Sequence, residues 1–183
     1  PEQAEIADTL VRRYPDEPAA QLLYGRSLIV AGRFAEALAP LRRAVELDSL
    51  SLHRDAGPCR ACEALVVMGL AYLYLDSTVA AERVMRPAYE SRLETQAYAG
   101  GLVQALVANG KYAETDERLR RAGEGVMSAE EVARGLITND IRRGAFEHAD
   151  AALQSVIANS APGFRSMGRW LLVISLRNQG RLE

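Results

Sequence analysis

The sequence predicts an all-α fold, a right-handed superhelical array of helix–turn–helix repeats known as an α-solenoid. The first observation is a short turn motif that recurs at Gly32, Gly110, Gly144 and Gly180, with Asp76 in the same slot. Successive motifs lie 44, 34, 34 and 36 residues apart. A fixed period of about 20–50 residues indicates stacked structural repeats.

The second observation is that apolar and small residues keep the same phase around every turn. Upstream, a pair seven and eight residues before the turn recurs as Tyr24-Gly25, Met68-Gly69, Leu102-Val103, Leu136-Ile137 and Leu172-Val173. Downstream, a small residue and, four positions later, a bulky one recur as Ala37 and Leu41, Ala81 and Met85, Thr115 and Leu119, and Ala149 and Leu153. Such offsets place each set on one helical face. The phase therefore predicts a helix on each side of every turn.

These helices divide residues 1–183 into one continuous array. In chain order it comprises the second helix of a partial repeat at 1–17, a repeat at 18–51, an extended connector at 52–61, repeats at 62–95, 96–129 and 130–163, and the first helix of a truncated repeat at 164–183. Because the chain begins at Pro1 and stops within a repeat, we expect it to be a piece of a larger protein. Lys111 is the only lysine among 22 basic residues, and this bias towards arginine suggests a bacterial source.

The pattern resembles the tetratricopeptide repeat (TPR) family, whose unit has 34 residues. The matching residues of the first full repeat are Tyr24, Gly25, Leu28, Gly32, Phe34, Ala37, Leu41 and Ala44. The sequence departs from the family at Asp140, which replaces an apolar core residue, so we expect the fourth repeat to be either distorted or locally polar. The resemblance implies a non-catalytic protein–protein interaction scaffold whose first helices line a concave groove. The Lys and Asn of the family's carboxylate clamp are absent, so the resemblance does not imply binding of chaperone tails.

The groove positions that follow from this resemblance fall between the packed positions of the first helices. They are Leu22, Arg26, Ile29, Val66, Leu70, Tyr74, Gln104, Arg134, Thr138 and Arg142. A mostly apolar row suits an amphipathic helix or an extended apolar peptide, and its arginines could orient an acidic or carbonyl ligand. Alternatively, flanking parts of the parent protein or a second copy of the chain could cover the row. The second copy would make the chain a self-assembly module and a homo-oligomer.

A Cys-x-x-Cys motif, Cys59 and Cys62, lies at the expected start of a first helix. A thiol at a helix N-terminus has a lowered pKa, so the pair could be a redox or disulfide pair, or a metal-responsive site with His53. The interpretation that we favour is that both cysteines are small, half-buried residues that pack the connector against its neighbour. No second Cys/His pair lies nearby in sequence, so we expect no bound metal. A thiol-based redox or metal-responsive regulator is the alternative function.

Composition narrows the remaining function classes. The net charge of -2, from 22 basic and 24 acidic residues, offers no electrostatic footprint for nucleic acid. No apolar stretch reaches the ~20 residues of a membrane span, so we expect no membrane insertion by this segment. The two histidines, His53 and His148, lie in no catalytic signature. We therefore expect neither an enzyme nor a cofactor, a protein or peptide as partner, and a cytoplasmic location.

Overall fold

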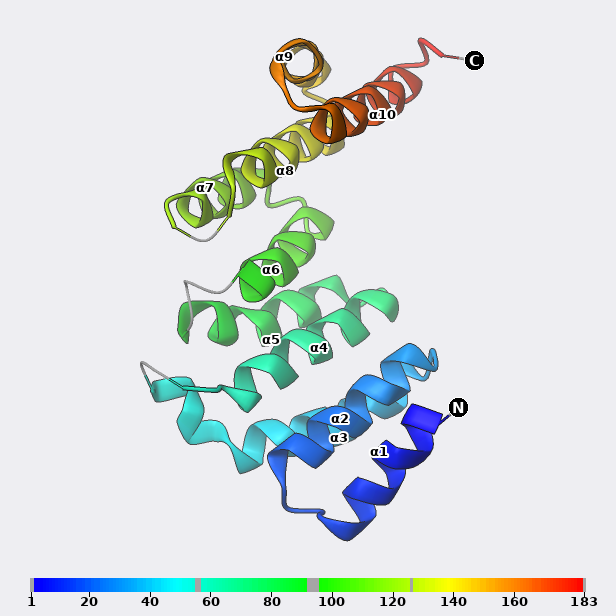
Figure 1. Ribbon diagram of the computed structural model, residues 1–183, viewed down its shortest axis with the longest axis vertical. Helices are drawn as coiled ribbons and strands as arrows, with labels where there is room; N and C mark the ends of the chain where they lie inside the picture. Colours follow the sequence, from blue (N-terminus) through cyan, green and yellow to red (C-terminus); the bar gives the residue numbers. More distant parts are fainter. Residues whose placement is uncertain (1, 55–56, 92–95, 126, 183) are drawn as a thin grey trace. The chain divides into compact units, whose positions relative to one another are not determined.

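The structure, a computed structural model, describes residues 2–54, 57–91, 96–125 and 127–182. These residues form α-helices and one 3-10 helix, joined by turns (Figure 1). The elements in chain order are α1 (Glu2–Arg13), α2 (Pro18–Val30), α3 (Phe34–Leu47), the 3-10 helix η1 (Ser49–His53), α4 (Arg60–Tyr74), α5 (Thr78–Ser91), α6 (Gln96–Ala108), α7 (Tyr112–Gly123), α8 (Ala129–Arg142), α9 (Phe146–Asn159) and α10 (Pro162–Asn178). The prediction of an all-α array of helix pairs is confirmed.

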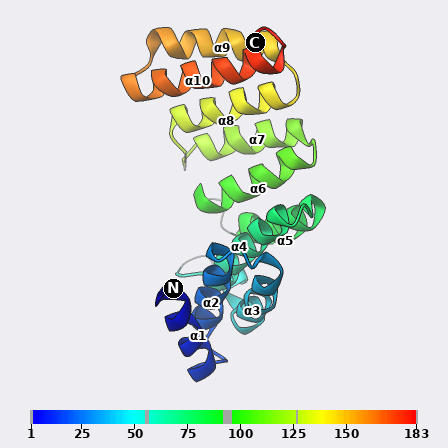
Figure 2. The ribbon, with the colours of Figure 1, turned by 90° about the vertical axis from the view of Figure 1, so that its right-hand side faces the viewer.

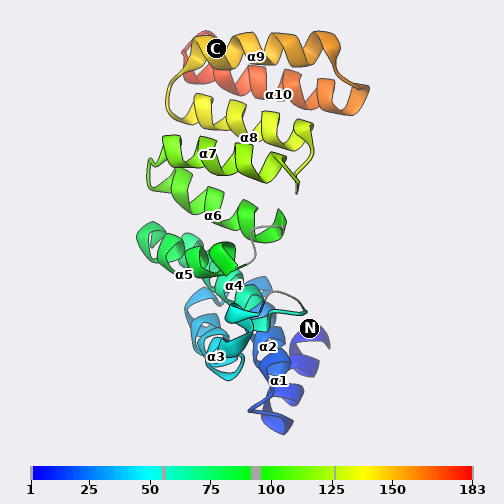
Figure 3. The same ribbon diagram turned by 90° about the vertical axis from the view of Figure 1, so that its left-hand side faces the viewer.

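The chain divides into two compact units, an N-terminal unit of Pro1–Asn109 and a C-terminal unit of Gly110–Glu183. The division falls inside the expected 96–129 repeat, between its two helices. In the N-terminal unit α2 pairs with α3 and α4 pairs with α5 (Figure 3). In the C-terminal unit the helices stack side by side: α7 contacts α8, α8 contacts α9, and α9 contacts α10 (Figure 2).

The recurring turns share one backbone conformation. Gly32, Gly144 and Gly180 have φ of 74°, 80° and 68°, and Asp76 adopts the same left-handed region with φ of 56°. In each turn the next residue's N–H donates to a carbonyl five positions earlier, as from Ser77 to Tyr72 over 2.8 Å. Asp is among the few residues with a Cβ that tolerate this conformation. The weaker turn motif therefore ends its helix in the same way as the glycine turns.

Glycines on the first helices allow close approach of the second helices. A Cβ placed on Gly25 would lie 2.5 Å from Cγ of Leu41, and one on Gly69 would lie 2.3 Å from Cγ of Met85. Leu41 and Met85 are fully buried. The small residue on one helix therefore makes room for the large residue on its partner, which gives the dense packing of protein interiors.

The start of α4 differs from the expected connector. Residues 52–61 contain the end of η1 and the first residues of α4, which begins at Arg60 rather than at 62. Oδ2 of Asp48 accepts the N–H groups of Arg60 and Ala61 at 2.9 and 3.4 Å. A carboxylate that satisfies the unpaired N–H groups stabilises a helix start, so Asp48 explains the earlier beginning.

The C-terminal unit contains the polar core expected around Asp140, which is buried. Its carboxylate contacts the guanidinium of Arg143 and Nδ1 of His148. Asp116 accepts hydrogen bonds from Nδ2 of Asn139 at 2.7 Å and from Nη1 of Arg143 at 3.0 Å. Buried polar groups of this kind stabilise a fold only when they are paired, and here side chains of α7, α8 and α9 pair with one another.

Candidate functional site

The first helices of the N-terminal unit form a continuous row, because α2 contacts α4 and α4 contacts α6. We call their shared surface the α2–α4–α6 face. Of its expected residues, Arg26, Tyr74 and Gln104 are exposed, whereas Ile29, Val66 and Leu70 are half-buried. Tyr74 is 64% exposed, and Val30, at the end of α2, is 86% exposed. Large apolar side chains on this face are therefore accessible to a partner.

Leu22 does not belong to this accessible set. It is only 3% exposed and lies in the buried cluster formed by residues of α2, α3 and α4. Both α1 and α4 contact α2, so the N-terminal part of α2 is covered on more sides than the helical phase alone suggests. The assignment of Leu22 to an open groove is therefore corrected: this residue is part of the core.

An aromatic pair lies at the C-terminal end of α4. The rings of Tyr74 and Phe34 are stacked, with centroids 4.4 Å apart and an interplanar angle of 10°. Phe34 is the first residue of α3, so the stack joins two neighbouring helix pairs. Aromatic contacts of this kind add about 0.5–1.5 kcal/mol beyond buried area, and they hold the exposed Tyr74 ring in one orientation.

An ion-pair network lies at the opposite end of α4. Oε2 of Glu63 is 3.3 Å from Nη2 of Arg26, and Oε1 is 3.0 Å from Nη1 of Arg60. Glu63 thus bridges α2 and the first turn of α4. The sequence suggested that Arg26 could orient a ligand, but in the structure its guanidinium already has a carboxylate partner.

The remaining expected groove residues lie on α8 of the C-terminal unit. Arg134 lines a cavity of about 270 Å³ together with Ser128, Glu130, Glu131, Gly163, Phe164 and Met167. The hydroxyl of Thr138 donates to the carbonyl of Arg134 over 2.8 Å, so it is occupied within its own helix. Arg142 is exposed, and its carbonyl accepts a hydrogen bond from the Tyr112 hydroxyl at 3.4 Å.

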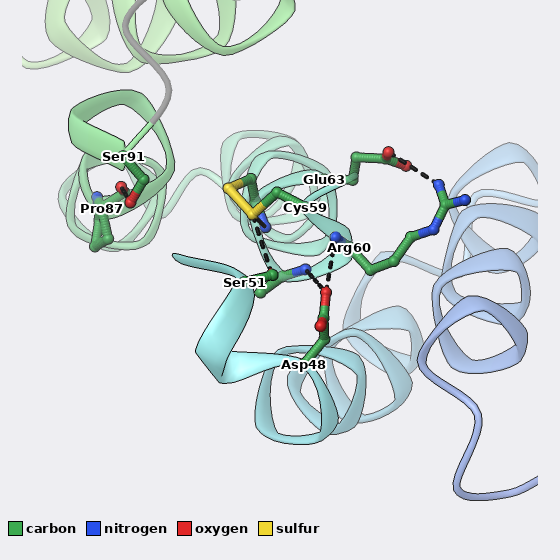
Figure 4. Close-up of a disulfide and its surroundings, with 9 residues drawn as sticks. Asp48, Ser51, Cys59, Arg60, Glu63, Pro87 and Ser91 are labelled. Carbon is green, nitrogen blue, oxygen red and sulfur yellow. Dashed lines mark hydrogen bonds and ion pairs between the residues drawn. A yellow bond between two sulfur atoms is a disulfide. The ribbon is translucent and has the colours of Figure 1, made fainter. Parts of the chain in front are cut away.

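Cys59 and Cys62 form a disulfide at the start of α4 (Figure 4). The sequence left several interpretations of these cysteines open, and the structure contains the disulfide. Both residues are buried, at 3% and 0% exposure. His53 is exposed, and the described part of the chain holds no cluster of three or more His, Cys, Asp or Glu side chains suited to a metal ion.

Sequence reasoning missed Glu63, although a signal for it existed. Glu63 lies three residues before Val66 and seven before Leu70, a spacing that places all three on one helical face. It was overlooked because the groove positions were assigned from the apolar row. A search for charged residues in that same phase would have found the partner of Arg26.

Comparison with known proteins agrees with this architecture. A tetratricopeptide repeat family model matches residues 3–51, whereas no curated protein matches the sequence significantly. None of the described helices is long and apolar enough to cross a membrane.

Solved structures resemble the chain over most of its length. YrrB, described as a TPR protein with an unusual peptide-binding site, matches with a TM-score of 0.67 at 18% identity, covering 98% of this chain and 87% of that chain. A putative kinesin light chain from Podosopora anserina with nearly identical TPR-like repeats gives 0.68 at 18% identity, covering 92% and 89%. MamA gives 0.59 at 14% identity, covering 97% and 81%. At these identities the likeness concerns the fold. Residues 3–51 thus match a tetratricopeptide repeat model, and the chain has the fold of TPR proteins over most of its length.

Proposed function

We propose that this protein is a non-catalytic protein–protein interaction scaffold whose α2–α4–α6 face binds an apolar peptide segment, helical or extended. The observation that carries the proposal is the row of accessible apolar side chains on that face, which ends in the stacked pair of Tyr74 and Phe34. Contiguous exposed apolar surface commonly marks an interaction site. TPR proteins are commonly interaction scaffolds, and peptide binding by YrrB supports the same role here.

The chemistry of the face favours a partner segment with few charges. Arg26 and Glu63 neutralise each other, so an acidic ligand would have to displace a carboxylate that is already bound. Burying the side chains of Val30, Leu70 and Tyr74 against a ligand would gain roughly 25 cal/mol per Å² of apolar surface. The amide of Gln104 is exposed and can donate to or accept from the ligand backbone.

The same residues support a binding role rather than a catalytic one. The ionisable groups of the face, Arg26 and Glu63, hold each other in an ion pair together with Arg60. Such an arrangement orients a surface and is poorly suited to proton transfer. In the C-terminal unit we propose Arg134 and Arg142 as contacts for acidic or carbonyl groups of a partner, since guanidinium groups form forked hydrogen bonds with such acceptors.

Affinity measurements on face variants test this proposal. A peptide selected from a random library on the wild-type protein is expected to bind Leu70→Glu and Tyr74→Ala at least about tenfold more weakly, because the few hot-spot contacts at the centre of an interface contribute ~2 kcal/mol or more. Isothermal titration calorimetry gives the affinities, and circular dichroism checks that the helices remain.

The matched control is Val79→Glu. Val79 is 74% exposed but lies on α5, a second helix, so this variant introduces the same charge away from the proposed face. Equal weakening by Leu70→Glu and Val79→Glu, or no weakening by either, would refute the assignment. If the wild-type protein instead self-associates and Leu70→Glu makes it monomeric in light scattering, the occupant of the face is a second copy of the chain.

A further inference from the structure

The disulfide belongs to a group of contacts that begins α4, which we call the α4 clasp: Asp48, Ser51, Cys59 and Cys62 (Figure 4). Sγ of Cys59, the N-cap residue, accepts the N–H of Cys62 at 3.1 Å. Asp48 accepts the two N–H groups before it, those of Arg60 and Ala61. Since the first N–H groups of a helix have no partner within the helix, these contacts satisfy the first turn.

The clasp is buried, and its sulfur atoms are held by the fold. Ser51 is fully buried, and its hydroxyl donates to Sγ of Cys59 over 3.2 Å. The same sulfur atom therefore receives hydrogen bonds from both η1 and α4. The sulfur of Cys59 is therefore one of the contacts that begin α4.

The first turn of α4 also carries the ion pairs of the α2–α4–α6 face. Arg60 lies between the two cysteines, and Glu63 directly follows Cys62. Glu63 reaches Arg26 on α2 at 3.3 Å. The residue that pairs with Arg26 therefore lies in the turn that the clasp begins.

We propose that Cys59 and Cys62 form a redox-controlled clasp that determines whether Arg26 is paired or available. In the oxidised protein the disulfide fixes the first turn of α4 and keeps Glu63 on Arg26. In the reduced protein the bond to Cys62 no longer holds the Cys59 side chain in place, so its Sγ can rotate away from the N–H of Cys62 that it caps. The first turn then loosens, Glu63 leaves Arg26, and a guanidinium becomes free to bind an acidic group.

The reductant is a small-molecule or protein dithiol. Because both sulfur atoms are buried, the reductant reaches them when the first turn of α4 opens locally. Its thiolate then attacks one sulfur, the S–S bond breaks, and a mixed disulfide forms. The second thiolate of the reductant then releases the protein, so that the cysteines gain two electrons and two protons while the reductant becomes a disulfide. A reducing cytoplasm favours the dithiol form, and an oxidising compartment favours the disulfide. The two forms would thus present different ligand preferences in different compartments.

Hydrogen exchange with mass spectrometry tests the clasp without any ligand. After reduction with dithiothreitol, the amides of residues 60–64 are expected to exchange about fivefold faster, the effect of losing one helix cap. The first turn of α8 is the internal control, because the side chains of Ser128 and Glu131 cap it without cysteine. Equal exchange in the two redox states would overturn the proposal, as would faster exchange throughout α2 and α5, which would indicate general destabilisation.

Two variants separate the cap from the covalent bond. Cys62→Ala removes the disulfide and is expected to exchange about as fast as the reduced wild type. Cys59→Ser combined with Cys62→Ala supplies an oxygen cap, which serine provides well, and is expected to restore slow exchange with or without dithiothreitol. Fast exchange in the double variant, with its helix content intact by circular dichroism, would contradict the capping mechanism.

Arginine-selective labelling with phenylglyoxal reports directly on Arg26. Its modification is expected to rise about twofold on reduction, the ordinary consequence of losing a half-exposed ion pair, while that of Arg12 on α1 stays constant. Unchanged labelling of Arg26 would overturn the link between the clasp and the face. The functional meaning of the clasp rests on the proposed peptide-binding role, but neither measurement uses a peptide. A result that refutes the redox-controlled clasp can therefore be distinguished from one that refutes peptide binding.

Discussion

Replacing Leu41 by alanine is expected to lower the free energy of unfolding of the N-terminal unit by about 2–5 kcal/mol, the usual cost of removing a buried leucine side chain. Leu41 is fully buried, and its Cγ occupies the space left by the missing side chain of Gly25. The substitution therefore opens a cavity between α2 and α3. Urea unfolding followed by circular dichroism measures the loss.

The Gly25–Leu41 contact also predicts that the effect of Gly25→Ala on stability changes sign when Leu41 is replaced. Alone, Gly25→Ala is expected to destabilise by about 1–3 kcal/mol, because its Cβ would overlap Leu41. In a Leu41→Ala background that overlap disappears, and the higher helix propensity of alanine should make Gly25→Ala neutral or stabilising by up to ~1 kcal/mol. Two simply additive losses in the double-mutant cycle would show that the close contact does not determine the packing of this pair.

Replacing Asp116 by alanine is expected to destabilise the C-terminal unit by about 3 kcal/mol, since it removes a buried carboxylate that pairs with Arg143 and accepts from the buried Asn139. Asp116 accepts from the buried amide of Asn139 and from Arg143. Burial lowers the pKa of Arg143, but the carboxylates of Asp140 and Asp116 outweigh this effect and raise it overall. Arg143 therefore remains charged and would lose one of its two carboxylate partners. Thermal and urea unfolding of the variant measure the change.

Glu117→Ala provides the matched control, because Glu117 is the next residue on α7 and is exposed. Its effect should stay within about 0.5 kcal/mol, as for most surface substitutions. Similar losses of stability for Glu117→Ala and Asp116→Ala would mean that the hydrogen bonds of Asp116 stabilise the unit no more than an exposed carboxylate on the same helix does.

Most of the fold could be predicted from the sequence, because each repeat contains a recognisable turn residue and the same spacing of small and apolar residues. Gly32 and Gly144 mark two helix ends directly, and the small-to-large pairing of Gly25 with Leu41 follows from their equivalent places in the repeat. A further signal remained unused: Glu82, Asp116 and Asp150 are spaced by 34 residues. Each is hydrogen-bonded to a polar side chain later in the chain, namely Asn109, Asn139 and Ser175.

The candidate site was less predictable, since helical phase gives the direction of a side chain but not what covers it. Leu22 points along the same row as Arg26, yet neighbouring helices bury it. The availability of Arg26 depends on Glu63, which is distant in sequence. The spacing of Cys59 and Cys62 allowed a disulfide but could not distinguish it from two packed thiols. These features depend on contacts between repeats, which the pattern within one repeat does not encode.

The most direct measurement of the central claim uses Gly100 on α6. A Cβ at this position meets no atom of the described residues within 4 Å, and Gly100 lies one turn before Gln104 on the same helical face. Gly100→Leu should keep or slightly raise the melting temperature, because glycine is a poor helix former. Its side chain should nevertheless obstruct the α2–α4–α6 face. Calorimetry with the selected peptide should show at least about tenfold weaker binding for Gly100→Leu and unchanged binding for Ala35→Leu, which adds the same side chain to an exposed position of α3. Wild-type affinity in a folded Gly100→Leu variant would contradict peptide binding on this face.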